Sequence, residues 1–402
     1  MTTSRNIVIA GAGIGGLTAA LALADKGFRV SVFEQAPRLE AVGAGIQLSP
    51  NATRILRDLG IGDVLKRSTV VPDALVVRSG ASGRAIVRMP LGAEAERRHG
   101  APYWMVHRGD LQAALVAAAE ANPDITLTLG VKVEDYATHR HGLTVQMRHA
   151  TGFDEEHCIA LIGADGLWSS LRSRIGNREQ PRFRKRTAWR SLVAATDVPE
   201  QFREPQIQLW LSGNAHLVHY PVRAGQAINI VAIARDSEER TGWSGEGAQP
   251  DLMEHFARGS WAPDARSLLM LPAEWQTWSL YDMPELRQWG EGAVTLLGDA
   301  AHPMLPFLAQ GAGMAIEDAA VLAGALARSP GDIPAALRAY EDARRSRTAL
   351  VQRASRRNGA IYHKTGAEAF IRNAGMRMLG GRRLIARYDW IYDWSEGEAV
   401  PS

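Results

Sequence analysis

A glycine-rich turn near the start of the chain has the spacing of a dinucleotide-binding loop. The residues from Gly11 to Gly16 read Gly-Ala-Gly-Ile-Gly-Gly and separate an apolar run, 7–10, from an Ala/Leu-rich helical segment, 17–26. The first glycine of such a loop makes a tight turn, the second lets the backbone approach a pyrophosphate, and the third lets helix and strand pack closely. The helix start then offers free N–H groups to phosphates. We therefore expect Gly11, Gly13, Gly15 and Gly16 to bind the cofactor.

Glu34 supplies the second part of this pattern. It ends a second strand-like run, 29–34, roughly twenty residues beyond the loop, where a carboxylate binds a ribose hydroxyl. A carboxylate there repels a 2′-phosphate, so the nucleotide should lack one. The β-α-β unit therefore predicts a dinucleotide, and it does not separate FAD from NAD.

Two more turns follow predicted strands. Gly163-Ala164-Asp165-Gly166 comes after the apolar run 159–164, and Gly298-Asp299-Ala300-Ala301-His302-Pro303 comes after the run 292–297. Gln310-Gly311-Ala312-Gly313 then leads into a helix that we expect to begin near Met314. Alone, a strand-end turn of this kind is weak evidence, but the succession of turns is specific.

With these motifs and His107-Arg108-Gly109-Asp110-Leu111, the chain resembles the FAD-dependent aromatic hydroxylases. The resemblance covers roughly the first three-quarters of the chain and is strongest to the salicylate hydroxylase, 3-hydroxybenzoate 6-hydroxylase and 6-hydroxynicotinate 3-monooxygenase group. It implies that Arg108 and Gln112 lie along the FAD pyrophosphate and ribityl chain. It also implies that Asp165 helps to hold FAD, in a motif linked to NAD(P)H use, and that Asp299 bonds a ribityl hydroxyl.

The resemblance also assigns a flavin edge. The Gly298 turn and the N–H groups of Gly311, Ala312 and Gly313 should face flavin N1/O2, where a helix dipole favours the anionic reduced ring. Pro303 and Pro306 should wall the flavin face, with Gln310 beside them. His302 is expected to shape this loop rather than to transfer protons.

The segment 213–221 carries the predicted substrate residues. Strand alternation places His216, Val218 and Tyr220 on one face and Leu217 and His219 on the other, with His216 and Tyr220 roughly 13 Å apart. In the related 3-hydroxybenzoate and 6-hydroxynicotinate enzymes a His and a Tyr hold matching pocket positions. His219 is more readily a core histidine, and this reading also stays open for His216. Gln47 stands where the 6-hydroxynicotinate enzyme carries a His, which favours hydroxybenzoates.

These patterns predict an α/β fold. A Rossmann-like FAD-binding domain is interrupted by an antiparallel-sheet substrate domain, and a helical C-terminal region follows. We assign 1–72, 100–180 and 271–360 to the FAD-binding domain, 73–99 and 181–270 to the substrate domain, and 361–402 to a C-terminal helical, aromatic tail. The tail residues 388–394 should pack against the body or a second subunit rather than cap a pocket.

Composition limits the partners and the cellular compartment that we expect for this chain. The net charge is +3 and the basic residues are not gathered in one patch, so no nucleic-acid partner is expected. The single cysteine, Cys158, excludes an intrachain disulfide, fits a reducing compartment and reads as a buried, inert thiol. No signal peptide or membrane span is recognisable, so we expect a cytoplasmic protein. No metal is expected, and a homodimer is left open.

The expected activity is hydroxylation of a small phenolic acid of the salicylate or 3-hydroxybenzoate type, with FAD, NADH or NADPH, and O2. A flavin C4a-hydroperoxide would attack a ring activated by its phenolate, and His216 or Tyr220 would take the phenolic proton. Two alternatives stay open. One is a flavin oxidoreductase that does not oxygenate, such as a reductase or halogenase. The other is a non-catalytic dinucleotide sensor, against which the retained flavin-edge segment argues.

Overall fold

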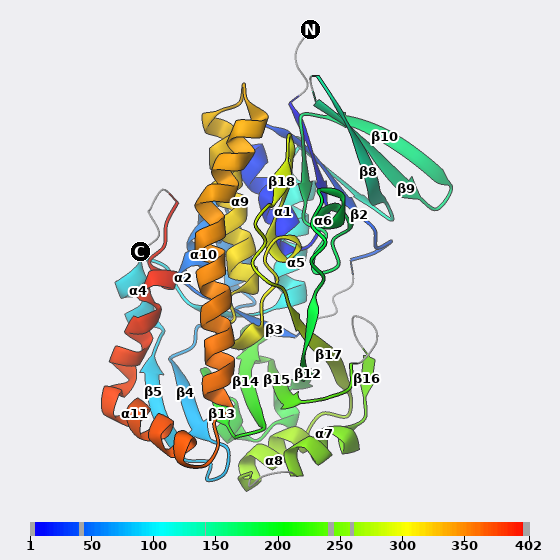
Figure 1. The fold of residues 1–402 in the computed structure, drawn as a ribbon. Helices are drawn as coiled ribbons and strands as arrows, with labels where there is room; N and C mark the ends of the chain where they lie inside the picture. Colours follow the sequence, from blue (N-terminus) through cyan, green and yellow to red (C-terminus); the bar gives the residue numbers. More distant parts are fainter. Residues whose placement is uncertain (1–4, 40–43, 141, 240–244, 258–260, 397–402) are drawn as a thin grey trace.

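The computed structural model describes residues 5–39, 44–140, 142–239, 245–257 and 261–396 (Figure 1). Within them, the sheet nearest the N-terminus has six strands, in the spatial order β18-β19-β11-β1-β2-β7. Their bounds are Gly290–Glu291, Val294–Leu296, Ala160–Gly163, Asn6–Ala10, Arg29–Glu34 and Ile125–Leu129. Neighbouring strands are parallel except β18 and β19. The carboxyl ends of β19, β11, β1 and β2 therefore meet at one edge, which brings together the motifs that follow them.

Helices cover this sheet. Helix α1 (Ile14–Asp25) is apolar on nearly all sides, and it is buried against α5 (Arg108–Glu120) and α9 (Gly311–Arg328). Helix α10 (Ile333–Tyr362) packs along α9, and its 30 residues carry the chain down to the second sheet (Figure 1). No helix among the described segments combines the length and the apolar character needed to cross a bilayer.

An antiparallel three-stranded sheet was not predicted. It consists of β8 (Lys132–His139), β9 (Gly142–His149) and β10 (Gly152–Cys158). Most of β10 is exposed or half-buried and is rich in charged residues, so it lacks the apolar alternation that would identify a strand.

The second large sheet has eight strands in the described residues, in the order β16-β17-β12-β15-β14-β13-β4-β5. Their bounds are Gly245–Gly247, Trp275–Asp282, Arg182–Ala194, Ala227–Arg235, Ala215–Val222, Gln206–Leu211, Ala74–Ser79 and Ala85–Pro90. All neighbours are antiparallel except β13 and β4, which confirms the predicted sheet type. Strand β17 lies past residue 270, where the sequence placed the domain boundary, and the boundaries themselves remain predictions.

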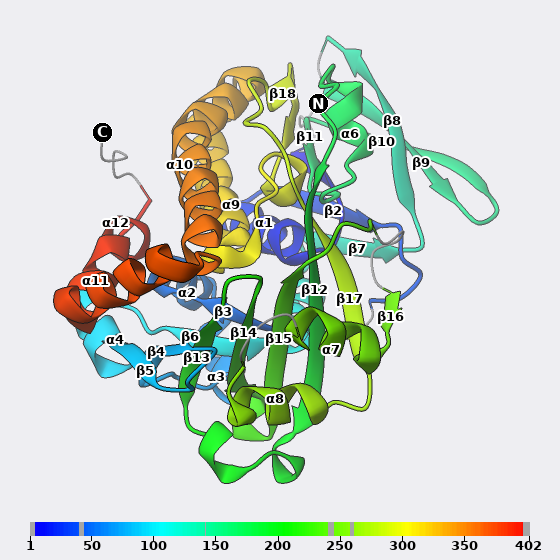
Figure 2. The same ribbon diagram turned by 60° about the horizontal axis from the view of Figure 1, so that its bottom comes forward.

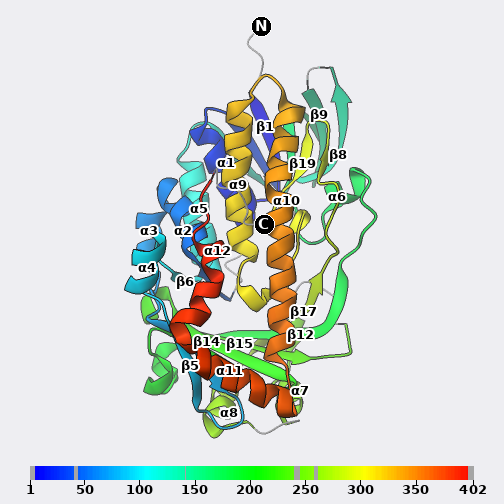
Figure 3. The ribbon, with the colours of Figure 1, turned by 60° about the vertical axis from the view of Figure 1, so that its left-hand side comes forward.

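The two faces of this sheet are covered differently. Helices α7 (Gln249–Ala257) and α8 (Pro263–Met270) pack on one face (Figure 2). The end of α10, helix α11 (Gly366–Ile385) and α12 (Asp389–Tyr392) lie against the other (Figure 3).

Short elements join the two sheets. Strands β3 (Gly45–Leu48) and β6 (Trp104–His107) form an antiparallel pair. Gly45 N donates to Asn229 Oδ1 of β15 at 2.7 Å, so the pair is fixed against the second sheet. The remaining helices are α2 (Pro50–Asp58), α3 (Gly62–Lys66), α4 (Ala93–His99) and α6 (Ser170–Arg174).

Candidate active site

The glycine loop joins β1 to α1 with little room for side chains. Gly11 has φ of +109°, and a Cβ there would lie 2.4 Å from Ala164 O. A Cβ on Gly16 would lie 2.0 Å from Gly11 O. A Cβ on Gly13 would have no described atom within 4 Å beyond its chain neighbours. The loop is therefore open at the one glycine where a pyrophosphate must approach the backbone.

The start of α1 is available to a ligand. In the described chain no side chain caps this helix and no acidic residue occupies its first turn. Glu34 accepts hydrogen bonds from Ala12 N and Ala36 N, each at 2.9 Å. Gln112 Nε2 donates to Ala12 O at 3.0 Å. Both side chains therefore lie beside the loop, in the region where the ribose and pyrophosphate are expected.

Two further glycines serve close packing. A Cβ on Gly15 would lie 2.7 Å from Leu297 Cδ2 and 3.0 Å from Ala315 Cβ. Gly298 has φ of +64°, and its Cβ would lie 3.1 Å from Ala315 Cβ. These glycines let α1, the turn after β19 and α9 approach one another.

Asp299 and Arg108 come from different motifs but share one electrostatic environment. Asp299 is exposed, yet surrounding protein desolvates its carboxyl and raises its pKa, while the charges of His302 and Arg108 oppose the rise. Arg108 begins α5 directly after β6. Arg108 and the carboxyl of Asp299 therefore lie close enough for their charges to interact.

One carboxylate oxygen of Asp165 accepts hydrogen bonds, and the other has no partner among the described residues. Its Oδ2 accepts from Ser170 N at 2.9 Å and Leu171 N at 3.3 Å, at the start of α6. Its Oδ1 is buried without a hydrogen-bond partner among the described residues. A ligand hydroxyl or N–H could satisfy that oxygen, which is what an FAD-binding role requires.

A buried ionic network, not predicted from the sequence, holds the Gly298 turn. Asp318 Oδ2 accepts from Gly298 N at 3.0 Å and lies 2.6 Å from His302 Nε2, while Arg344 Nε donates to Oδ1 at 2.7 Å. Burial opposes ionisation of Asp318, but the charges of His302 and Arg344 outweigh it and lower the pKa of its carboxyl to about 2. His302 is thus a structural partner of the turn, as expected.

The network extends to the C-terminal tail. Arg347 donates to both Glu317 oxygens, at 2.6 and 2.7 Å, and to the carbonyls of Trp390 and Ile391. Arg344 and Arg347 both lie over the Trp394 ring. Two adjacent acids within the apolar helix α9 were the available sequence signal, because buried carboxylates need partners.

Helix α9 begins at Gly311 rather than near Met314. Its N-cap, Gln310, makes no capping bond, and no acid occupies the first turn. Gln310 is buried, donates to Ser49 Oγ at 2.8 Å and accepts from Asn51 Nδ2 at 3.2 Å. The side chain of Gln310 is therefore committed to α2 and its cap, while the helix start is left for a ligand.

A cavity of about 1120 Å³ lies between the second sheet and the C-terminal helices. Apolar strand residues form its sheet side: Leu75, Val77, Val87, Met89, Ile207, Leu209 and Val218. The segment 306–309, the end of α10, helix α11 and the aromatic tail form the rest. Pro306 lines the cavity, whereas Pro303 is buried, with its carbonyl accepting from Gln352 at 2.8 Å.

Gln47 and His216 bring polar groups to this cavity. Tyr103 donates to Gln47 Oε1 at 3.0 Å, and Gln47 also hydrogen-bonds the Tyr220 hydroxyl. Burial raises the pKa of Tyr220, and the charge of Arg190 and the Gln47 bond only partly oppose this. Tyr220 therefore keeps its proton at neutral pH.

The histidines of β14 face opposite ways, as alternation predicted. His216 lines the cavity and lies 3.0 Å from His363, measured from Nδ1 to Nε2. His219 packs on the α7/α8 side, where it accepts from Trp210 Nε1 at 3.3 Å. Burial lowers the pKa of both imidazoles, to about 3 for His219.

The aromatic tail packs against the rest of the protein and also lines the cavity. Tyr388, Trp390 and Tyr392 border the cavity, and the Tyr392 ring meets Tyr103 edge-on at 6.0 Å. Near it, Asp389 and Asp393 gather around His99, but Arg98 and His99 already partner these carboxylates. This acidic pair therefore reads as a structural contact.

The parallel sheet, with the glycine loop and the uncapped start of α1 at one edge, has the architecture of a dinucleotide-binding protein. Residues 4–355 match the family described as FAD binding domain. The chain is 38% identical to 3-hydroxybenzoate 6-hydroxylase 1 of Aquipseudomonas alcaligenes, over 98% of each chain. It is 35% identical to 3-hydroxybenzoate 6-hydroxylase of Polaromonas naphthalenivorans, over 98% of this chain and 97% of that one. A salicylate hydroxylase in a substrate complex superposes with a TM-score of 0.82 at 26% identity, over 100% of both chains.

The chain thus belongs to the FAD binding domain family and is an FAD-dependent aromatic-ring monooxygenase, as the motifs predicted. The matches disfavour the non-oxygenating and sensor alternatives, because the full-length relatives named here are hydroxylases.

Proposed function

We propose that the enzyme hydroxylates a small hydroxybenzoate, with 3-hydroxybenzoate as the first substrate to test, using O2 and NADH or NADPH. The names of its relatives support this substrate class. The observation that carries the proposal is the cavity itself, which combines apolar walls, a buried neutral histidine and cationic side chains.

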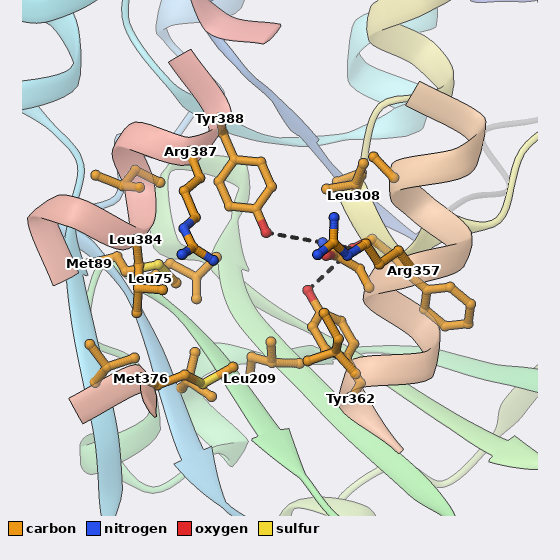
Figure 4. Close-up of a pocket in the computed structure, with 18 of the residues that line it drawn as sticks. Leu75, Met89, Leu209, Leu308, Arg357, Tyr362, Met376, Leu384, Arg387 and Tyr388 are labelled. Atoms are coloured by element: carbon orange, nitrogen blue, oxygen red, sulfur yellow. Dashed lines mark hydrogen bonds between the residues drawn. The ribbon is translucent and has the colours of Figure 1, made fainter. Parts of the chain in front are cut away.

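The cationic side chains suit a carboxylate. Arg353, Arg357, Lys364, Arg372 and Arg387 line the cavity, against one acid, Glu368. Figure 4 shows Arg387 and Tyr388 on one side and Arg357 on the opposite side. Arg353 pairs with Glu285, whereas no described residue hydrogen-bonds or pairs with Arg357 or Arg387. We assign carboxylate attraction to Arg357 and Arg387, since an unpaired guanidinium binds a carboxylate strongly.

His216 is the base in this proposal. Its imidazole is neutral at neutral pH because burial, His363 and Arg186 all lower its pKa. A neutral ring can accept the phenolic proton, and the resulting phenolate activates the ring positions ortho and para to it. Tyr220 and Tyr103 stay protonated and, through Gln47, fix the polar end of the cavity.

The residues at the sheet edge fit FAD. Glu34 and Gln112 would lie beside the adenosine ribose and pyrophosphate, Arg108, Asp165 and Asp299 along the ribityl chain, and the start of α9 at the flavin ring. The chemistry that bound FAD would supply, once reduced by a nicotinamide nucleotide, is the activation of O2 for transfer of one oxygen atom to the aromatic ring. The chain positions the acid, takes the phenolic proton and excludes water.

The test is nicotinamide oxidation by the FAD-loaded enzyme with 3-hydroxybenzoate, salicylate and benzoate, with products identified by mass. We expect a hydroxylated product from a hydroxybenzoate and none from benzoate, which has no phenolic proton. Absence of product from every hydroxybenzoate would refute the proposal.

A further inference from the structure

His363 meets His216 at the side of the cavity, and no motif singled it out. His216 lies on β14, and His363 is the C-cap of α10, 147 residues away. Their rings are 5.0 Å apart between centroids, and Nδ1 of His216 lies 3.0 Å from Nε2 of His363. The rings of Phe307 and Tyr362 also pack against His216.

The hydrogen bonds define which nitrogens carry protons. His363 Nδ1 lies 2.7 Å from Gly359 O, and a carbonyl only accepts, so Nδ1 of His363 must carry the proton. Nε2 of the neutral His363 is then an acceptor, and the proton between the rings belongs to Nδ1 of His216. Nε2 of His216 therefore keeps its lone pair, and it has no hydrogen-bond partner among the described residues. This is the nitrogen that a phenol in the cavity would meet.

The surroundings of His363 disfavour its imidazolium form, so a proton that reaches the ring is readily released again. Burial is the main cause that lowers the pKa of His363, to about 4. The charges of Arg186 of β12, Arg372 of α11 and Arg235 of β15 act in the same direction, and the Gly359 bond opposes them. The C-terminal end of α10 stabilises an imidazolium only in part. His216 is buried while His363 is half-buried, so the pair leads from the cavity toward the surface.

We propose that His216 and His363 form a proton path between the substrate hydroxyl and solvent. The phenol O–H bond breaks and its proton joins Nε2 of His216. The Nδ1 proton of His216 moves to Nε2 of His363, and the His363 imidazolium then releases its Nδ1 proton, which had been donated to Gly359 O, to water. The reverse steps return a proton to the oxygen when the hydroxylated ring regains aromaticity, so both rings recover their starting tautomers. His363 relays the proton through His216 and does not itself touch the substrate, and the path rests on the proposed function.

Two substitutions separate conduction from positioning. In His363→Gln the amide oxygen can accept from His216 and the NH2 group can donate to Gly359 O, but the side chain cannot relay a proton. His363→Leu loses both properties. His149→Gln, at the end of β9 and away from the cavity lining, is the control. Stopped-flow mixing of FAD-loaded enzyme with 3-hydroxybenzoate and a pH indicator measures proton release, and product formation is followed in parallel.

We expect both His363 variants to slow proton release and hydroxylation, by roughly 10²-fold, with flavin reduction unchanged and added imidazole restoring part of the rate. Wild-type rates in His363→Gln would overturn the path, even if His363→Leu is slow, because positioning alone would then suffice. If His363→Gln loses FAD, His363→Asn is measured in its place. A wild-type enzyme that hydroxylates no phenolic acid would instead refute the proposed function itself.

Discussion

Replacing Asp318 by asparagine should destabilise the protein by about 2–4 kcal/mol. The fully buried carboxylate receives hydrogen bonds from Gly298 N and Arg344 and contacts His302 Nε2 at 2.6 Å. Lowering its pKa from 3.8 to about 2 corresponds to roughly 2 kcal/mol, since each pKa unit is worth about 1.4 kcal/mol. The upper end allows for leaving the Arg344 charge with Glu317 as its remaining buried carboxylate.

The sign of the pH dependence follows from the lowered pKa. A carboxyl whose folded-state pKa is lowered contributes stability above its unfolded pKa, near 4, and loses it as the pH falls through about 2. The gap between wild type and Asp318→Asn should therefore be full at pH 7 and should narrow between pH 4 and 2.

Urea unfolding followed by circular dichroism, with excess FAD, measures this difference. Asp342→Asn is the matched control, since Asp342 is exposed and pairs with Arg345 on the surface of α10. That control should cost less than about 0.5 kcal/mol. Equal free energies of unfolding for the two variants, or a gap that widens in acid, would refute the reasoning.

Three further predictions concern the cofactor and the cavity. Asp299→Ala should weaken FAD binding by about 10- to 100-fold, because it removes a charge-assisted hydrogen bond worth about 1.5–3 kcal/mol. Flavin fluorescence on dilution measures the FAD that is released, and unchanged retention of FAD would contradict the ribityl role of Asp299. His216→Ala should keep the yellow colour of bound FAD and slow hydroxylation by about 10²–10⁴-fold, whereas His219→Ala should lower stability and leave turnover per folded enzyme unchanged. The amount of hydroxylated product formed by each variant tests this. A slow His219→Ala beside an unaffected His216→Ala would refute the assignment of His216 as the base. The double variant Arg357→Gln/Arg387→Gln should raise KM for 3-hydroxybenzoate more than KM for an uncharged phenol. Equal increases for both substrates would show that the two arginines do not bind the carboxylate.

The local motifs could be predicted because each glycine or acid stands within two residues of the end of a strand. Gly11, Asp165 and Gly298 follow β1, β11 and β19, so parallel pairing alone brings them to one edge. The faces of β14 followed from its alternation, because His216 and His219 are an odd number of residues apart. Both inferences needed only local periodicity.

Other features depend on long-range contacts that periodicity cannot show. Arg347 reaches Glu317 and the tail carbonyls only because α10 packs along α9. Gln310 turns toward Ser49, 261 residues away, although its motif suggested the flavin face. The His216–His363 pair likewise forms only when the end of α10 reaches the second sheet.

The most direct test of an FAD-dependent hydroxylase acting on a phenolic acid is the origin of the new oxygen atom. The FAD-loaded enzyme is supplied with a reduced nicotinamide nucleotide and 3-hydroxybenzoate under O2 labelled with a heavy oxygen isotope, and the mass of the product is measured by mass spectrometry. The account predicts a dihydroxybenzoate that carries one heavy oxygen atom, with nicotinamide oxidised in step. Nicotinamide oxidation without a labelled aromatic product, across the hydroxybenzoates, would contradict it.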